Sequence, residues 1–441
     1  MSWERLILKE ILKQAKAPIQ ILKEKEYKLV TISNNGSITL RKIEKGIQIS
    51  ADKAYAAKKG AFIYSRLSVH NGAFGIVPDD LDGALITSEM PIFDINANTL
   101  PDFLIYSLKL PSFKLQLNNL TKGMGRTRVK EDSFLSLYID IPSIDEQKSI
   151  INEISDKEQL VTNISKLSLY QLDLLKKLRQ QILQDAVQGK LVPQDLNDEP
   201  ASVLLEQIKA EKEKLVREKK IKKGKLQEAE TQEELLFDIP KNWIWCNLDE
   251  ICANITDGTH QTPSYTQNGR IFLSAQNVKP FKFMPEDHKY VSEDAYQEYI
   301  KNRKPEKGDI LVARVGAGIG EAAVINQEID FCFYVSLGLV QPIKELTNSE
   351  FLTMVINSPY GVKYAKGNIS SKGGSAGNFN LGRIRSLLIP LPPLAEQQRI
   401  LTKIDQLMTL FDELEQTIQQ NKKYTQELLQ VALKEALEQK N

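Results

Sequence analysis

The sequence predicts a mixed α/β (α+β) protein with two globular domains that are related by an internal repeat, each followed by a long helix. The strongest observation is that residues 139–190 recur as residues 389–440, offset by 250 positions without a gap. The segments before them also match, at an offset of 248. This period is too long for a solenoid, and 441 residues exceed what one hydrophobic core normally holds. The chain is therefore predicted to be a duplicated half-molecule.

The first globular domain is expected over residues 1–140. Its short β-branched and aromatic runs, separated by Gly, Asn and Asp, are typical of strands in a mixed domain. Asn34-Asn35-Gly36 lies between two such runs and predicts a hairpin. Lys59-Gly60 opens a further strand, AFIYSR, which ends at Arg66.

A central helical region is expected over residues 141–236. Ser143 and Glu146 have the spacing of a capping box, in which a hydroxyl and a carboxylate each satisfy a backbone amide. A three-four spacing then runs from Ile150 through Leu178 to Ile182, which indicates a coiled-coil seam rather than a broad globular face. About 45 helical residues, at ~1.5 Å each, predict a rod roughly 65–70 Å long.

The second domain is expected over residues 237–388 and the second helix over 389–441. The strand DILVAR follows Lys307-Gly308 and ends at Arg314, the counterpart of Arg66. Pro392-Pro393 suits a first helical turn, and the seam continues through Leu428. The residues expected to build the helical scaffold and its partner surface are Glu146, Gln147, Ile150, Ile154, Glu396, Gln397, Ile400, Ile404, Leu407, Phe411 and Leu414.

Composition and charge exclude several classes of protein. The chain is 41% hydrophobic, and it contains no apolar run of about 18 residues that would span a membrane. The first residues mix acids with bases, which argues against a signal peptide. Three cysteines without metal spacing suit a reducing cytoplasm. The net charge is +5 for residues 1–142 and zero for 237–392, whereas each helical part is negative, so phosphate binding is expected on the globular domains.

Catalytic motifs are the rival interpretation, and none is supported. The GAGIGE run at 316–321 lacks the third glycine of GxGxxG and leads into a strand, so a glycine hairpin is expected. Asn357-Ser358-Pro359-Tyr360 is one residue from the Asn-Pro-Pro-Tyr motif of amino-methyltransferases, but no suitable Gly-rich cofactor loop precedes it. The three histidines lie far apart, so neither a metal site nor a catalytic triad is expected.

Polar loops suited to base edges and phosphates remain. Residues 256–262 form a run of short donors and acceptors, and Gln pairs bidentately with adenine in the major groove. Each half also has a basic Gly-rich loop before its helix. The candidate DNA-binding residues are Thr256, Asp257, Gly258, Thr259, His260, Gln261, Thr262, Gln276, Asn277, Arg314 and Lys372 in the second half, and Arg66, Lys122, Arg126 and Arg128 in the first.

The whole chain resembles the DNA-specificity subunit of bacterial type I restriction-modification systems. The motifs that carry this resemblance are IPLPPLAEQQRI at 389–400, its diverged copy IDIPSIDEQKSI at 139–150, the long run from Leu178 to Leu215, IPKNWIWCNLDEI at 239–251, TDGTHQTPSY at 256–265 and KGDILVARVGAGIGEAAVI at 307–325. The first domain departs from the pattern, because no Gly-Thr-His-Gln-Thr-Pro run precedes residue 142.

This resemblance implies two target-recognition domains, separated by two long antiparallel coiled-coil helices, that each read half of a split site in double-stranded DNA. It implies a non-catalytic chain without a cofactor of its own. Two methyltransferase subunits and the restriction (translocase) subunits are the expected partners, and S-adenosylmethionine, Mg²⁺ and ATP are expected in those subunits. The alternatives are a specificity subunit of a related bipartite system that cuts on both sides of its site, a self-contained methyltransferase and a purely structural coiled-coil adaptor.

Overall fold

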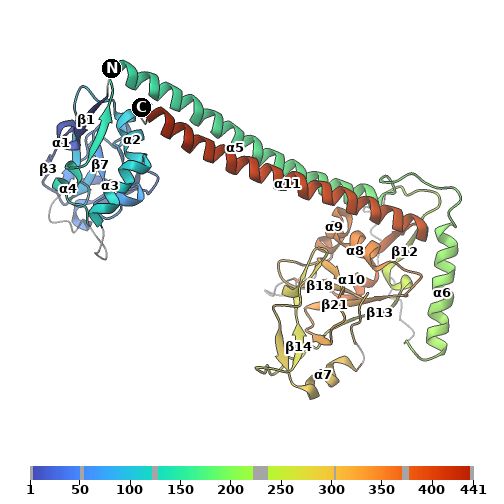
Figure 1. Ribbon diagram of the computed structural model, residues 1–441. Coiled ribbons are helices and arrows are strands. Elements are labelled where there is room, and N and C mark those ends of the chain that lie inside the picture. The colour runs from blue at the N-terminus through green and yellow to red at the C-terminus, as the bar shows by residue number, and fades with distance from the viewer. Residues whose placement is uncertain are drawn as a thin grey trace. The chain divides into compact units, whose positions relative to one another are not determined.

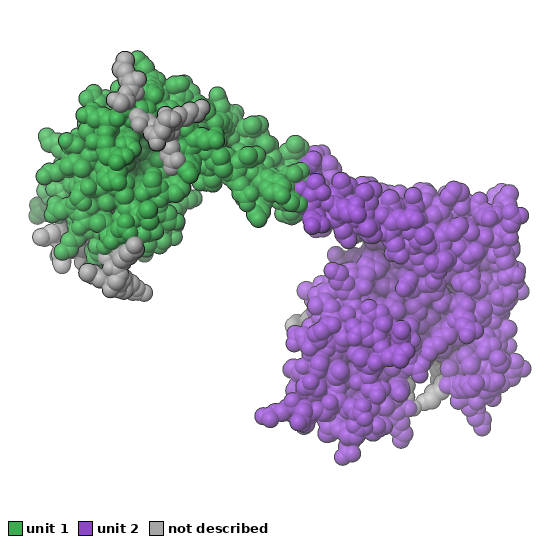
Figure 2. All heavy atoms as spheres, viewed as in Figure 1, with its two compact units in different colours: residues 1–169, 418–441 green, residues 170–417 purple. Residues whose placement is uncertain are grey.

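The chain forms two compact units, residues 1–169 with 418–441 (unit 1) and residues 170–417 (unit 2), which Figure 2 colours separately. The computed structural model describes residues 3–49, 54–121, 128–221, 237–301, 304–369 and 377–437. Both units are built from small sheets and short helices, and two long helices run through both of them.

Unit 1 contains a ribbon and two larger sheets. Its strands are β1 (Glu4–Ile7), β2 (Leu12–Gln14), β3 (Pro18–Ile19), β4 (Glu26–Ile32), β5 (Ile38–Lys45), β6 (Ala54–Ala56), β7 (Phe62–Tyr64), β8 (Phe74–Ile76), β9 (Leu85–Thr87), β10 (Ile92–Ile95) and β11 (Tyr138–Ile141). Its short helices are α1 (Leu8–Ile11), α2 (Pro101–Lys109), α3 (Pro111–Thr121) and α4 (Glu131–Leu135). The ribbon joins β1 to β11, and the sheet orders are β2-β10-β7-β8 and β3-β6-β9-β4-β5. The predicted hairpin at Asn34–Gly36 is confirmed, because it joins the antiparallel strands β4 and β5.

Aromatic side chains fill the core of unit 1. Tyr64 stacks on Phe134 with ring centroids 4.3 Å apart, and both Phe62 and Phe93 pack beside Tyr64. The Tyr64 hydroxyl donates to the carbonyl oxygen of Val129, which satisfies its one polar atom in this apolar setting.

Unit 2 repeats this plan. Its strands are β12 (Ile244–Asn247), β13 (Cys252–Asp257), β14 (Arg270–Leu273), β15 (Val278–Lys279), β16 (Lys282–Phe283), β17 (Lys289–Val291), β18 (Ile310–Ala313), β19 (Ala322–Val324), β20 (Phe331–Phe333), β21 (Leu337–Pro342) and β22 (Leu388–Leu391). Its short helices are α6 (Ala201–Arg217), α7 (Glu293–Ile300), α8 (Ser349–Asn357), α9 (Pro359–Gly367) and α10 (Leu381–Arg385), with 3-10 turns at Leu248–Ile251 (η5) and Ala275–Asn277 (η6).

The topology confirms the predicted duplication. The ribbon β12–β22 corresponds to β1–β11, and the sheet β13-β21-β18-β19 has the same order of equivalent strands as β2-β10-β7-β8. The parallel pair β14–β20 corresponds to the parallel pair β4–β9. The halves differ in size at this last sheet, which has three strands in unit 2 and five in unit 1.

The long helices are α5 (Ile144–Val187) and α11 (Leu394–Leu437), each of 44 residues (Figure 1). In unit 1, Ile150 and Ile154 pack in one cluster with Leu433 and Leu437. In unit 2, Arg179 donates to Asp412, 2.7 Å away, and stands over the ring of Phe411. Low numbers in α5 thus lie opposite high numbers in α11, so the two helices are antiparallel as expected.

The predicted seam is right along the first part of each helix, where Ser168 is also buried, and wrong at three later leucines. Ile150, Ile154, Ile400, Ile404 and Phe411 are buried as expected. Leu178, Leu414 and Leu428 are exposed, by 45%, 43% and 68%, although the three-four frame places them inside. The physical reason is periodicity, because a straight α-helix drifts about 20° per heptad from a strict 3.5-residue repeat. Arg179 therefore takes the inward position that Leu178 was expected to hold.

The start of α5 also differs in one detail from a capping box. The Ser143 hydroxyl accepts from the Glu146 amide, 3.4 Å away, as expected. The Glu146 carboxylate, however, accepts from the indole of Trp3 at 3.0 Å. The same arrangement recurs at the start of α11, where Glu396 accepts from Trp243 at 2.9 Å.

Candidate nucleic-acid interface

The candidate reading loop of unit 2 leaves β13 at Asp257 and returns at Arg270, the first residue of β14. Gly258 and Thr259 are buried, and the Thr259 amide donates to the Phe333 carbonyl at 3.0 Å. A Cβ on Gly258 would lie 2.1 Å from the Phe333 oxygen, so only glycine fits there. The next residues, His260, Gln261 and Thr262, are exposed. The loop therefore has a buried backbone frame and an exposed polar edge.

Arg314 holds this frame from inside. Its side chain is buried; Nη1 donates to Asp257 Oδ2 at 2.5 Å and to the Val335 oxygen at 3.0 Å, and Nε donates to the Phe379 oxygen at 3.1 Å. Asp257 Oδ2 also lies 3.2 Å from His260 Nε2. Because these acceptors engage Nε and Nη1 of a buried side chain, the geometry favours a positioning role for Arg314 over the DNA contact expected from the sequence.

Gln276 and Asn277 also differ in exposure, since Asn277 is buried and Gln276 is exposed. Asn277 is buried, and its side chain accepts from the Ser274 amide and donates to the Met284 and Asp287 carbonyls. Its expected DNA contact is therefore replaced by a role in shaping the turn. Gln276 is exposed beside it, and its Nε2 donates to the Asp287 carbonyl at 3.3 Å.

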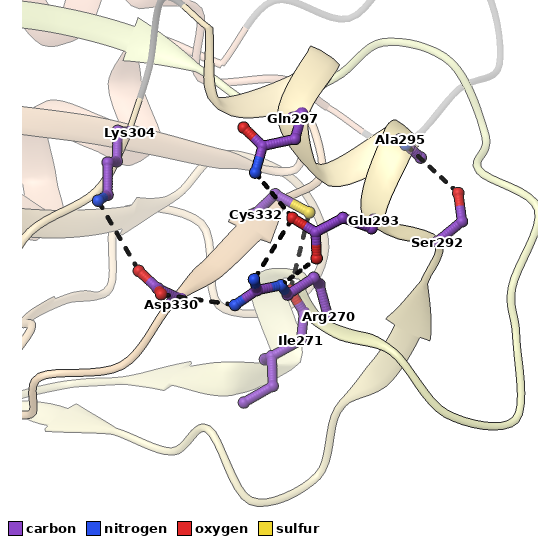
Figure 3. A network of polar contacts seen from close by, with 9 residues as sticks. All are labelled: Arg270, Ile271, Ser292, Glu293, Ala295, Gln297, Lys304, Asp330 and Cys332. Atoms are coloured by element: carbon purple, nitrogen blue, oxygen red, sulfur yellow. Dashed lines mark hydrogen bonds and ion pairs between the residues drawn. The ribbon is translucent and has the colours of Figure 1, made fainter.

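A network of charges anchors the far end of the reading loop (Figure 3). Arg270 makes two hydrogen bonds to the Glu293 carboxylate, 2.5 and 3.3 Å long, and lies 3.5 Å from Asp330. Lys304 approaches Asp330 at 3.8 Å, and Gln297 donates to Glu293 at 2.7 Å. The network ties β14 to α7 and to the start of β20. Sequence analysis missed it, since the partners of Arg270 lie 23 and 60 residues away and no local pattern links them.

The two candidate residues of unit 1 that the structure describes are both paired. Arg66 donates to Glu131 at 2.5 Å and is mostly buried, as its counterpart Arg314 is. Arg128 is exposed and lies 3.1 Å from Glu89. Lys122 and Arg126 lie outside the described residues, as does Lys372 of unit 2.

The scaffold residues at the two helix starts form matching polar anchors. Gln147 donates to the Pro142 carbonyl, and Gln397 donates to the Pro392 carbonyl. Ile150 and Ile400 are buried one turn further along. Glu396 is buried against Trp243 and also accepts from Gln194, and this burial raises the pKa of its carboxyl. Leu407 is partly buried in the core of unit 2.

The motifs that suggested catalysis have structural explanations. The Asn357 side chain accepts from the Ala322 amide and donates to the Ala322 carbonyl, so both ends of its amide group hold β19. Tyr360 donates to the Leu388 carbonyl. Gly316 and Gly320 have φ of 89° and 87° in the turn between antiparallel β18 and β19, which confirms the predicted glycine hairpin.

Two further surveys of the described residues bear on function. Within the ranges given above, no cluster of three or more His, Cys, Asp or Glu side chains is arranged to hold a metal ion. No helix in the described part of the chain has the length and apolar character needed to cross a membrane.

Comparison with known proteins gives one consistent family. The model of the type I restriction modification DNA specificity domain matches residues 2–173 and 240–422. The specificity subunit of the type I restriction enzyme EcoAI of Escherichia coli is 34% identical over 266 residues, which cover 57% of this chain and 42% of that protein. The EcoEI specificity subunit, also from Escherichia coli, is 28% identical over 306 residues, covering 66% and 51%. The chain thus spans about half the length of these curated relatives.

Solved structures share the fold. The HsdS subunit from Thermoanaerobacter tengcongensis has a TM-score of 0.54 at 18% identity, covering 99% of this chain and 96% of that one. A chain solved for the complex assembly and conformational transition of the type I R-M system has a TM-score of 0.59 at 17% identity, covering 99% and 97%.

Proposed function

The chain belongs to the family of type I restriction modification DNA specificity domains, and from this premise we propose that it is a non-catalytic subunit that reads a bipartite DNA target. Each unit reads one half-site, and the bases between the half-sites are left unread. Methylation and cleavage are performed by partner subunits, which bind S-adenosylmethionine, Mg²⁺ and ATP.

The observation that carries this proposal is the construction of the 256–262 loop. Arg314 and the Phe333 carbonyl hold its base, while His260, Gln261 and Thr262 project to solvent. Such a loop presents its donors and acceptors without first having to order its backbone, and this lowers the entropic cost of binding. A glutamine side chain in that position matches the donor and acceptor of adenine in the major groove.

The proposed methyltransferase partners are supported by exposed apolar residues that occur at equivalent positions of the two repeats. Leu160, Leu174 and Leu178 of α5 are 59%, 43% and 45% exposed. Their counterparts 250 positions later, Leu410, Tyr424 and Leu428 of α11, are 48%, 49% and 68% exposed. Exposed apolar residues that recur together mark a protein interaction site, and their duplication fits two copies of one partner.

Two measurements on the purified chain test this function. The first titrates it with labelled duplex DNA at two salt concentrations, and the proposal expects affinity that falls steeply with salt. The second titrates it with S-adenosylmethionine by calorimetry, and no binding is expected. Tight S-adenosylmethionine binding by the chain alone would support a self-contained methyltransferase, and salt-insensitive or absent DNA binding would support a structural adaptor.

A further inference from the structure

The hairpin β15–β16 of unit 2 projects an aromatic side chain from a firmly anchored base. Val278 is buried, and Phe283 packs with its ring centroid 5.7 Å from that of Phe331. The Met284 amide donates to the Asn277 carbonyl, and the Asn277 side chain donates back to Met284. Phe281, at the tip, is nevertheless 48% exposed. The base of the hairpin is therefore rigid while its tip faces solvent.

The backbone at the tip is one that phenylalanine disfavours. Lys279-Pro280-Phe281-Lys282 has proline at the second position, and Phe281 has φ of 63° at the third. That combination is the signature of a type II turn, in which glycine is preferred at the third position. A side chain in the left-handed region is strained, and strain of this kind clusters at ligand-binding sites. The Phe281 amide donates to the Ala322 carbonyl at 2.9 Å, which helps to hold this conformation.

Two lysines flank the phenylalanine and face each other. Lys279 and Lys282 are directly opposed in the antiparallel register of the hairpin. Like charges in this position repel each other. Lys279 approaches Glu321 at 3.7 Å, whereas Lys282 forms no ion pair with any residue that the structure describes. An anionic ligand would relieve this repulsion, and a pair of phosphates would relieve it on both sides of the tip.

The hairpin and the reading loop start from neighbouring points. The Val335 amide donates to the Thr259 carbonyl in the loop. The next residue, Ser336, accepts through its hydroxyl from the Ala275 amide, three residues before the hairpin begins. Gln276 is exposed between the two elements. The segment after β20 thus fixes both elements on one part of unit 2.

We propose that this hairpin is a DNA wedge, in which Phe281 packs against a base step in the groove while Lys279 and Lys282 bind phosphates on either side. Proteins that deform DNA insert apolar side chains in this way, because distorting the duplex creates further contacts. The inference rests on the proposed function, since it assumes that unit 2 reads a half-site. It adds a contact that the polar loop does not supply, beside the bases that the loop reads.

Substitution of Phe281 by glycine separates strain from binding. Phe281→Gly removes both the aromatic ring and the backbone strain, so the Tm of the full chain should stay equal or rise. Affinity for a fluorescein-labelled duplex that carries the target motif, mapped beforehand by methylome sequencing, should fall by roughly tenfold, the scale of a truncated interface anchor. Phe281→Trp keeps an aromatic wedge and should retain most of the affinity.

The lysines are tested by salt dependence. Lys279→Ala with Lys282→Ala should reduce the slope of log affinity against log salt by about 1.8, because each phosphate that the protein no longer neutralises lowers the slope by about 0.9. Lys307→Ala, at an exposed lysine of the same unit, is the matched control and should leave the slope unchanged.

The outcomes distinguish the wedge from the function on which it depends. If wild-type chain shows no salt-sensitive preference for the mapped duplex, the proposed function itself fails. If the wild type has that preference and Phe281→Gly and the double lysine variant bind as it does, the wedge is wrong and the function stands. A fall in Tm for Phe281→Gly, or equally weak binding by Phe281→Trp, would assign Phe281 to the fold and overturn the wedge.

Discussion

At the scale of single residues, the sequence predicted which loop is polar but not which of its side chains face outward. Arg314 has the right chemistry for a phosphate or a guanine, yet its acceptors on Asp257, Val335 and Phe379 lie 57, 21 and 65 residues away. Such partners are invisible to local patterns. The exposure of Gln261 also depends on tertiary structure. Gly258 and Thr259, which precede it in the same polar run, are buried.

Gln261→Ala tests the reading loop most simply. The Gln261 amide hydrogen bond to Thr259 Oγ1 belongs to the backbone, so the variant keeps it and the loop should retain its shape. Removal of one bidentate base interaction should weaken specific binding by about 1–3 kcal/mol, or roughly 5- to 150-fold. Competition titrations against non-specific duplex measure this. Gln327→Ala, at an exposed glutamine elsewhere in unit 2, is the control. Unchanged specificity in Gln261→Ala would remove the loop as a reader.

Asp309 makes a pH-dependent contribution to the stability of unit 2. Burial raises the pKa of its carboxyl from 3.8 to about 6, although it accepts hydrogen bonds from Gln341 and from the Glu306 amide. The folded state therefore holds the proton more tightly than the unfolded state, so this carboxyl lowers stability as pH rises from about 4 to about 6. The full penalty, up to about 3 kcal/mol, is present at neutral pH.

Asp309→Asn removes the charge and keeps an oxygen that accepts the same hydrogen bonds. The variant should be more stable than the wild type at pH 7, by at most about 3 kcal/mol. The difference between them should shrink as the pH falls through 6 toward 4. Chemical denaturation of both proteins across this range measures it. A difference that is constant with pH would show that Asp309 is not the titrating group.

At the scale of elements, the strands were predictable because they depend on local pattern. The seam between the long helices was only partly predictable, since small drift accumulates over 44 residues. This drift also bears on the proposed partner surface. Leu178 and Leu428, which a strict heptad frame places inside, belong to the exposed apolar set that we assign to partner subunits.

Phe411 and Leu414 should therefore behave differently although they are one turn apart. Phe411 is 4% exposed, and Phe411→Ala should destabilise unit 2 by about 3–5 kcal/mol. Leu414 is 43% exposed, and Leu414→Ala should change stability by less than about 0.5 kcal/mol while weakening partner binding. Thermal unfolding and the mass of the assembled complex measure the two effects. Equal destabilisation by both variants would contradict the revised seam.

At the scale of the whole molecule, the duplication fits the proposed function, in which one chain reads two half-sites and binds its partner twice. Fold and repeat were predictable because they follow from a pattern that covers the full length. The target bases were not predictable, since exposed side chains on matching loops vary freely on one scaffold and DNA deformability adds to direct contacts. The hairpin proposed as a wedge was not predicted from the sequence, because the exposure and the φ of Phe281 depend on the tertiary structure.

The central claim is that the two halves read DNA independently, and one measurement tests it most directly. Residues 237–388 are replaced by the equivalent domain of another family member, and the methylome is sequenced in cells that carry the hybrid with its partner subunits. The proposed function predicts that one half of the methylated motif changes while the other half and the spacer stay the same. Change in both halves, or in neither, would contradict it.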